Sequence, residues 1–550
     1  MHPTTEAARE ARTPWLASVV HILEQSGWAR FSLVFLLILV LKWDTLLQPP
    51  VWDTAMGLFP PALTLAENGF DLLELLAMPG YEEGGPNAHS TSLLTLATAT
   101  VLWATGGGTM AFPILHLLHF IVAALALLTL FRLARPVFGG VTTVLLCVSV
   151  LLHPIFSTQV GYLYMEMPLF LFTVLALFAW TERRFWPAVL WATLAYATKE
   201  TGIIVPATLA LAVLLERRDL PDKARRVAQI TVFPVLWTAG VALLSRIAVS
   251  RAEDFAFLPS LGVVFGGIGQ YLARFLLNVP DLLVFIAVFF VMALVYVIPI
   301  LGALRTEPID PSVRSQEHRE LLVLGYSGLL IVFFILLFMV ALPVVAGFTI
   351  VLPRYYVMIL PFLLLWVGYG VKRLLGSRLT SPAAVCFVLL SAFFALNTSG
   401  ALYPLDIDTE GPGNDPALTE RSNAYRRLLA LEMDAIRALE ELPPEVPVYY
   451  GHYEHYLLQY PGLGYSSGPL LNGHNFSVES LGEFIRREPM PPCVYALFNY
   501  PWLGGEKILG LIRFAETTPG LSAEVVREFR DGRYVIILAR IRSGDADCPA

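Results

Sequence analysis

Long apolar runs alternate with short polar segments over the first 397 residues of the chain. The first run covers 31–41, and ten more follow at 110–131, 138–153, 162–180, 187–199, 202–216, 228–248, 281–304, 321–346, 353–371 and 381–397. A helix needs about 20 apolar residues to cross the hydrocarbon core of a bilayer, and several runs are shorter than that. The segment 91–105 is also apolar but ends at Gly106-Gly107-Gly108, which favours a half-helix or a re-entrant segment. The pattern predicts an all-α polytopic membrane domain with about eleven transmembrane helices, and up to thirteen.

The pattern changes after residue 397. Helical periodicity covers 416–442, and three shorter segments (446–450, 494–498 and 534–541) have the composition of strands. A small C-terminal α/β domain is therefore predicted. The predicted organisation is an N-terminal segment (1–30), a membrane domain (31–397) with a long first outer loop (47–90), and a C-terminal domain (398–550).

The composition agrees with this division. Hydrophobic residues make up 56% of the 550 residues and charged residues only 15%, whereas soluble domains are about one quarter charged. These values exclude a soluble globular enzyme. A formal charge of −7 without a basic block excludes a nucleic-acid-binding protein. From Thr398 onward, 13 Lys and Arg face 21 Asp and Glu, so the C-terminal domain is acidic.

Basic residues predict the orientation of the membrane domain. They gather in six segments: Arg9, Arg12 and Arg30; Arg132 and Arg135; Arg183 and Arg184; Arg217, Arg218, Lys223, Arg225 and Arg226; Arg305, Arg314 and Arg319; and Lys372, Arg373 and Arg378. All six lie on one side if 91–105 does not cross, and the positive-inside rule makes that side cytoplasmic. The run 31–41 is followed by Lys42-Trp43-Asp44 without a small-residue cleavage site, which predicts an uncleaved anchor. The C-terminal domain is then extracytoplasmic.

Ionisable residues at membrane level are costly, so they are candidates for function. The predicted topology places Asp53, Glu166, Lys199, Glu200 and Arg354 at the outer ends of spans. Such a set suits group transfer from a lipid phosphate. Cations would hold the phosphate leaving group, and a carboxylate would accept the proton of an incoming hydroxyl.

Each of these residues also has a plainer interpretation. Asp53 could cap the amphipathic stretch that follows it, and Glu166 could face water at the interface. Lys199 and Glu200 could pair with each other in an exposed turn. Arg354 could extend its side chain to the interface within an aromatic belt.

The remaining polar candidates are weaker. His89 ends the first outer loop and is on its own more typical of a loop residue than of a ligand. The segment His452-Tyr453-Glu454-His455 has a spacing that could suit a metal, but no third ligand is evident, and we interpret it as ordinary surface. No metal site is predicted. Cys493 and Cys548 would fit a disulfide in an oxidising compartment, although spacing alone does not establish one.

Five short motifs follow one another between residues 30 and 375. They are Trp52-Asp53-Thr54-Ala55, His89-Ser90-Thr91-Ser92-Leu93, Arg132-Leu133-Ala134-Arg135-Pro136-Val137-Phe138-Gly139, Thr198-Lys199-Glu200-Thr201-Gly202 before Pro206, and Arg354-Tyr355 before Pro361. This ordered set resembles the integral-membrane glycosyltransferases of the GT-C fold, in the bacterial family-39-like group. That group includes the protein O-mannosyltransferases and the lipid A aminoarabinose transferases. Thr54 replaces the second acidic residue of the family's Asp-Glu form, and prolines that usually follow the histidine are missing, so the acceptor type stays open.

The resemblance implies a hexosyl- or pentosyltransferase that uses a polyprenyl-phosphate or dolichyl-phosphate sugar. Transfer to a lipid, glycan or protein acceptor would occur on the extracytoplasmic face with inversion, in the bacterial inner membrane. The implied site comprises Asp53 and Glu166 as catalytic residues, Arg354, Lys199 and Tyr355 on the donor phosphate, and His89 and Glu200 as substrate contacts. Whether a divalent cation takes part stays open.

Two other classes of function remain. A transporter or flippase of a lipid-linked sugar would need two matched halves with interrupted helices near the midplane, and no such halves are visible in the sequence. A non-catalytic membrane scaffold would use its C-terminal domain to bind partners. The sequence does not identify the sugar, the acceptor, the length of the carrier lipid or the oligomeric state.

Overall fold

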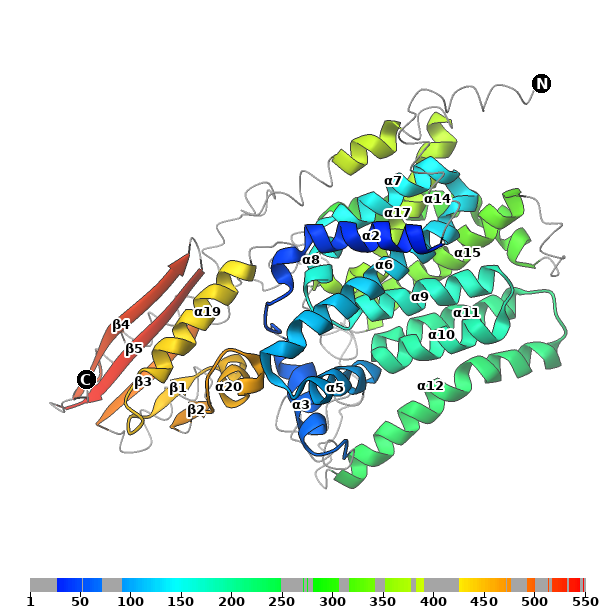
Figure 1. Ribbon diagram of the computed structural model, residues 1–550. Coiled ribbons are helices and arrows are strands. Elements are labelled where there is room, and N and C mark those ends of the chain that lie inside the picture. The colour runs from blue at the N-terminus through cyan, green and yellow to red at the C-terminus, as the bar shows by residue number, and fades with distance from the viewer. Residues whose placement is uncertain are drawn as a thin grey trace. The chain divides into compact units, whose positions relative to one another are not determined.

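The chain forms two compact units in the computed structural model. The structure describes residues 27–51, 53–71, 92–248, 280–305, 316–341, 352–376, 382–389, 425–470, 472–475, 492–499, 517–531 and 534–544, with Tyr271, Phe275, Arg513 and Cys548. The first unit comprises Met1–Leu46 and His116–Asn397, and the second comprises Leu47–Leu115 and Thr398–Ala550. Figure 1 labels the main helices and strands of both.

In the first unit, the described residues form helices and no strand. The helices are α2 (Gly27–Leu41), η3 (Trp43–Thr45), α6 (Ala111–Phe138), α7 (Gly140–Leu152), α8 (Pro154–Gly161), α9 (Glu166–Thr181), α10 (Phe185–Thr198), η7 (Glu200–Ile203), α11 (Ile204–Leu215), α12 (Leu220–Ala248), α14 (Pro280–Arg305), α15 (Gln316–Ile335), η8 (Leu336–Ala341), η9 (Pro353–Met358) and α17 (Leu360–Leu375). Helices cover most of the described residues of the first ten predicted apolar runs; of the run 321–346, only 321–341 is described. Of the last run, 381–397, only 382–389 is described, and it is helical.

Few of the described helices are long enough to cross a membrane by themselves. Three meet the requirements of length and apolar composition: Gly108–Phe138, Asp281–Arg305 and Gln316–Ala341. A fourth results if α7 and α8, which are bent by 63° at their junction, count as one broken span. Shorter apolar helices, such as Glu166–Thr181, accompany them. The described helices thus support a polytopic membrane domain, and the count of eleven to thirteen spans stays a prediction.

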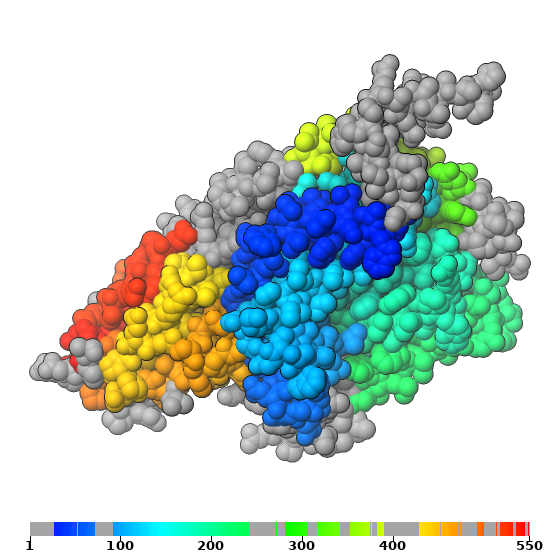
Figure 2. Space-filling model, in the orientation of Figure 1, coloured from blue at the N-terminus to red at the C-terminus, as the bar shows by residue number. Residues whose placement is uncertain are grey.

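Helix α2 lies at the surface of the first unit, where Figure 2 shows it in dark blue. Most of its exposed positions are apolar: Leu33 is 45% exposed, Leu36 53% and Val40 74%. Water would disfavour an apolar surface of this kind, whereas lipid chains would not. The exposure of these side chains is therefore consistent with a membrane anchor.

The second unit combines short helices with one mixed sheet. Its elements are η4 (Thr54–Leu58), α3 (Phe59–Glu67), α5 (Leu93–Thr105), η6 (Gly108–Met110), α19 (Tyr425–Glu440), β1 (Val448–Tyr450), α20 (His452–Gln459), η11 (Pro461–Leu463), β2 (Gly473–Asn475), β3 (Cys493–Asn499), β4 (Leu521–Asp531) and β5 (Tyr534–Ser543). The strand order is β2-β1-β3-β5-β4. β1 pairs in parallel with β2 and β3, and β5 pairs antiparallel with β3 and β4. The predicted C-terminal α/β fold is thus observed.

The sheet is covered where its sequence is apolar. All seven residues of the central strand β3 are buried, as expected for a continuous apolar run with neighbours on both faces. Helix α19 packs on β4 and β5. Its buried residues Leu428, Glu432, Ile436 and Leu439 follow the three- and four-residue spacing of one helix face. A disulfide joins Cys493, the first residue of β3, to Cys548.

The first part of the predicted outer loop packs within the second unit, against the C-terminal residues. The amphipathic stretch 54–67 forms η4 and α3, and α20 packs on η4. The Tyr465 hydroxyl donates a hydrogen bond of 2.9 Å to the carbonyl oxygen of Pro50. Gly462 fits closely over Leu63, because a Cβ at this position would lie 2.9 Å from the leucine side chain.

Two segments lie mostly outside the described residues. They are 70–90, within the predicted first outer loop, and 249–279, between α12 and α14. α5, by contrast, is described and ends at Thr105, where Gly106, Gly107 and Gly108 adopt φ values of +73°, +77° and +70°. Only glycine tolerates three such values in succession without strain. The glycines therefore end this helix sharply, as the sequence predicted.

Candidate functional site

Three ionisable side chains meet in the interior of the first unit. The Lys199 Nζ lies 2.6 Å from Glu166 Oε1, and the Arg354 Nε lies 3.6 Å from the same oxygen. Glu166 is 3% exposed, Lys199 7% and Arg354 4%. The plainer interpretations of these residues, an interfacial carboxylate, an exposed turn and an interfacial arginine, therefore do not describe their positions in this structure.

Aromatic rings border the two cations. The Lys199 Nζ lies 4.5 Å from the centroid of the Tyr355 ring. The Arg354 guanidinium lies 4.9 Å from the Tyr164 ring centroid and 5.2 Å from that of Tyr355. Electron-rich ring faces attract cations, and more strongly where water is excluded. The rings thus help to hold two like charges near each other.

The helix ends explain how two of these residues come together. Helices α9 and α10 pack against each other and are joined by a short turn, so the beginning of α9 lies near the end of α10. Glu166 is the first residue of α9, where its negative charge is favoured by the helix dipole. Lys199 follows the last residue of α10 in an extended conformation.

Gly202 allows the chain to turn closely after Lys199. Its amide donates a 2.8 Å hydrogen bond to the Lys199 carbonyl. A Cβ at this position would lie 2.2 Å from the carbonyl oxygen of Ala195, in the last turn of α10. The glycine of the Lys-x-x-Gly motif is thus required by packing. Arg354 comes from η9, which packs against α8 and α9.

The other predicted site residues are placed differently. Asp53 belongs to the second unit, is exposed, and directly precedes the buried η4 turn. Its side chain makes no capping hydrogen bond to that turn, so the helix-cap interpretation is wrong. Glu200 is exposed, although it follows the buried Lys199. His89 lies outside the described residues.

The sequence reading missed buried histidines near the cluster. His119 and His116 lie one turn apart on α6 and are 5% and 2% exposed. A ring nitrogen of His119 lies 3.2 Å from the carbonyl oxygen of Gln159. The charge of Glu166 influences His119 electrostatically. The sequence signal that could have identified them is a pair of histidines three residues apart within the apolar run 110–131.

The interpretation of the segment His452-Tyr453-Glu454-His455 as ordinary surface is wrong, because Glu454 is buried. It is 5% exposed, and its neighbour Tyr453 is 6% exposed. Tyr453 donates a 3.3 Å hydrogen bond to Glu432, which is 2% exposed and also receives a 3.1 Å bond from Asn499 Nδ2. The segment is therefore part of a buried carboxyl cluster in the second unit. Among the described residues, no group of three or more His, Cys, Asp and Glu could hold a metal ion.

The comparisons with known proteins yield structural neighbours. No protein-family model matches the sequence, and no curated protein matches it either. The apo crystal structure of ArnT from Cupriavidus metallidurans is similar to this chain, with 16% sequence identity and a TM-score of 0.42, over 93% of this chain and 98% of that chain. The structure of the same protein bound to undecaprenyl phosphate has 16% identity and a TM-score of 0.41, over 94% of this chain and 98% of that chain.

Proposed function

We propose that this protein is a membrane glycosyltransferase that takes a sugar from a polyprenyl-phosphate or dolichyl-phosphate carrier. The buried cluster of Glu166, Lys199 and Arg354 carries the proposal. One carboxylate faces two cations, so the formal charges of these three residues sum to one positive charge. A buried charge is costly unless it is compensated. The phosphate of a lipid carrier, bound against Lys199 and Arg354, would provide that compensation.

Each member of the cluster has a distinct proposed role. Arg354 binds the phosphate through parallel hydrogen bonds, which a planar guanidinium is shaped to make. Lys199 adds a point charge beside it. Glu166 is a positioning residue, because its Oε1 already contacts both cations and holds them in place. The ring of Tyr355, next to Lys199, borders the same phosphate.

The proposed reaction is a single displacement at the anomeric carbon. An acceptor hydroxyl oxygen forms a bond to this carbon while the bond to the carrier phosphate oxygen breaks, and the phosphate leaves with the electron pair. Lys199 and Arg354 stabilise the charge that develops on the phosphate. The proton of the acceptor passes to the Asp53 carboxylate. The role of Asp53 is proposed from the sequence resemblance alone.

The disulfide supports an extracytoplasmic location of the second unit. Disulfides persist in oxidising compartments and are rare in the cytosol. The pair Cys493–Cys548 belongs to the acidic C-terminal region that the basic loops predict to lie outside. Asp53 belongs to the same unit. We therefore propose that transfer occurs on the outer face of the membrane.

The test is transfer of labelled sugar from a polyprenyl-phosphate donor in membranes, at matched protein level. Lys199→Met should reduce transfer by about 10²-fold or more, because the loss of a preorganised charge at the leaving group costs about that much. Lys199→Arg should retain part of the activity. Glu182→Gln is the control, since it changes an exposed carboxylate just beyond the far end of α9.

Two outcomes would overturn this function. Wild-type transfer by Lys199→Met would remove the cluster from the reaction. The other outcome is a wild-type protein that moves the lipid-linked sugar between leaflets and leaves its sugar in place. That result would identify a flippase, the alternative function that the sequence left open.

A further inference from the structure

A charged cavity lies at the other end of the α9–α10 pair. Its volume is about 830 Å³, and its lining comes from the α11–α12 connection and the end of α14. Charged side chains dominate the lining, among them Glu216, Arg217, Arg218, Asp222, Lys223 and Arg305. The proposed transfer reaction uses none of them.

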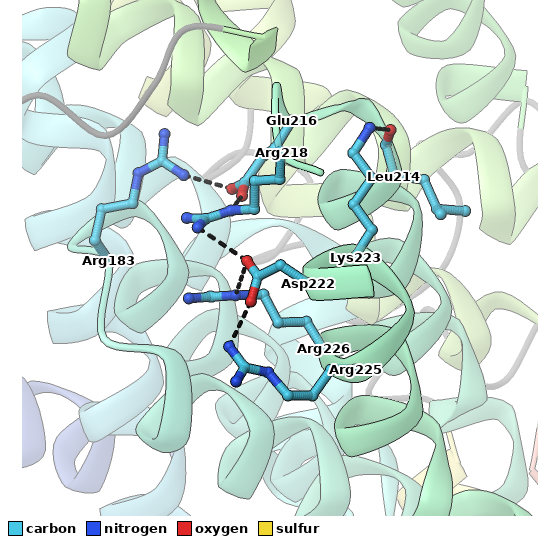
Figure 3. Close-up of polar contacts among 8 residues, drawn as sticks. All are labelled: Arg183, Leu214, Glu216, Arg218, Asp222, Lys223, Arg225 and Arg226. Carbon is cyan, nitrogen blue, oxygen red and sulfur yellow. Dashed lines mark hydrogen bonds and ion pairs between the residues drawn. The ribbon is translucent and has the colours of Figure 1, made fainter. Parts of the chain in front are cut away.

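Two carboxylates form ion pairs with arginines on one side of this cavity. Glu216 is buried and lies 2.5 Å from Arg183 Nη1 and 2.6 Å from Arg218 Nε. Figure 3 shows the Arg218 side chain between Glu216 and Asp222. Asp222 also binds Arg225 and Arg226, at 2.5 and 3.2 Å.

These ion pairs leave a surplus of positive charge. Together, Glu216 and Asp222 form ion pairs with four arginines. Three further cations line the cavity, Arg217, Lys223 and Arg305, and they face one further carboxylate, Asp219. Arg217 and Arg305 are exposed. Seven cations and three carboxylates therefore leave the cluster strongly positive. Among its exposed arginines, Arg217 and Arg305 line the cavity and come from different segments of the chain.

Apolar side chains border the charged lining. Leu214 lines the cavity and is 51% exposed, and Leu220, which follows the lining residue Asp219 in the sequence, is 77% exposed. Exposed leucines beside exposed arginines are typical of the level at which acyl chains meet headgroups. The 16 residues of α9 separate Arg183 from Glu166 by about 24 Å. This separation places the cavity and the Glu166 cluster at opposite ends of the same helices, and the positive-inside rule assigns the cavity to the cytoplasmic side.

We propose that this cavity binds the phosphate headgroup of an anionic phospholipid from the cytoplasmic leaflet. Arg217, Lys223 and Arg305 surround the phosphate, and Leu214 and Leu220 contact the first acyl carbons. Basic pockets between membrane helices on this side attract anionic lipids through the same charges that orient the protein. The site is independent of the proposed transfer reaction, and it would anchor the end of the helix pair that carries Glu166 and Lys199.

The test uses the purified full-length protein in detergent and native mass spectrometry, with phosphatidylglycerol as probe and phosphatidylcholine as the neutral lipid. The double variant Arg217→Ala/Arg305→Ala should weaken phosphatidylglycerol binding roughly 30-fold, since each cation near the membrane surface contributes about fivefold. The control Arg132→Ala/Arg184→Ala removes two exposed arginines that do not line the cavity, and it should stay within about twofold of wild type. If the double variant unfolds, Arg305→Gln alone should show about fivefold weaker binding.

Three results would overturn the proposal. Equal losses in both double variants would show a general effect of surface charge. Unchanged binding in Arg217→Ala/Arg305→Ala would show that the cavity is not the site. Displacement of phosphatidylglycerol by inorganic phosphate at equal concentration would assign the cavity to a soluble phosphate compound.

Discussion

Replacing Glu432 by Gln should change how the stability of the second unit depends on pH. Burial raises the pKa of the Glu432 carboxyl to about 8, and the nearby Glu454 carboxyl contributes to that rise. The hydrogen bonds from Asn499 and Tyr453 act in the opposite direction. Asn499 Oδ1 is buried without a hydrogen-bond partner among the described residues, so it is available to accept a hydrogen bond from a neutral, protonated carboxyl group. Glu432 is therefore protonated in the folded protein at neutral pH.

The sign and size of the effect follow from linkage. The ordinary pKa of 4.5 applies in the unfolded chain, so the folded protein binds one more proton between about pH 4.5 and 8. The stability that this proton contributes is fully present below pH 4.5 and is lost as the pH rises through 8. One pH unit corresponds to about 1.4 kcal/mol, so the loss between pH 5.5 and 8 is on the order of 3 kcal/mol. The amide of the Glu432→Gln variant binds no proton, so this variant lacks the loss.

The assay is thermal unfolding of the full-length protein in detergent at pH 5.5, 6.5, 7.5 and 8.5. The melting temperature of Glu432→Gln minus that of wild type should rise with pH up to about 8, because titrations that are independent of Glu432 cancel in the difference. Asp434→Asn on the same helix is the control, since Asp434 is exposed and forms its ion pair with Arg437, one turn further along α19. Its difference from wild type should be flat. A flat difference for Glu432→Gln as well would refute a buried, neutral Glu432.

Four further substitutions test the proposed transfer site, the close packing at Gly202 and the disulfide. Arg354→Ala should lower donor use more than Arg354→Lys, because only the guanidinium can chelate phosphate; equal, wild-type transfer rates in membranes would contradict this. Asp53→Asn should lower transfer about 10²–10⁴-fold at matched expression, with a milder loss if the acceptor is itself a phosphate. Gly202→Ala should reduce both folded yield and transfer, because its Cβ would lie 2.2 Å from a backbone oxygen, and normal yield would show that η7 can shift. Cys548→Ser should lower the free energy of unfolding of the second unit by about 2–4 kcal/mol, measured as a lower melting temperature without reductant, and the difference should vanish with reductant.

The sequence predicted the membrane helices and the buried charges better than it predicted contacts. Apolar runs identify helices because burial in lipid or protein requires them, and Glu166, Lys199 and Arg354 stood out because charge at membrane level is costly. The contacts of one Glu166 oxygen with both cations depend on how three helix ends meet in space. Lys199 is 33 residues away from Glu166 in the sequence, and Arg354 is much further away. No local pattern encodes such distances.

In the second unit, the sequence pattern did not predict one strand, whereas it could have identified one buried carboxyl group. Strand β4 was missed because most of its residues are exposed and lack an apolar alternation, and its pairing with β5 is what makes it a strand. Glu432 could have been found, since it lies four residues from both Leu428 and Ile436, on the apolar face of α19. A carboxyl group at such a position predicts a buried acid.

The bond between Tyr465 and Pro50 bears on how the protein is made. It joins residues 415 positions apart, and a ribosome adding about 5–20 residues per second needs roughly 20–80 s to cover that interval. During this time the apolar side chains of η4 and α3, Leu63 among them, are not yet covered by the C-terminal residues that pack on them in the folded protein. The chain therefore has a long-lived nascent state that invites chaperones or proteases. A truncated chain that ends near Asn397 would lack the C-terminal residues that pack on η4 and α3, and such a product should be degraded rather than accumulate in the membrane.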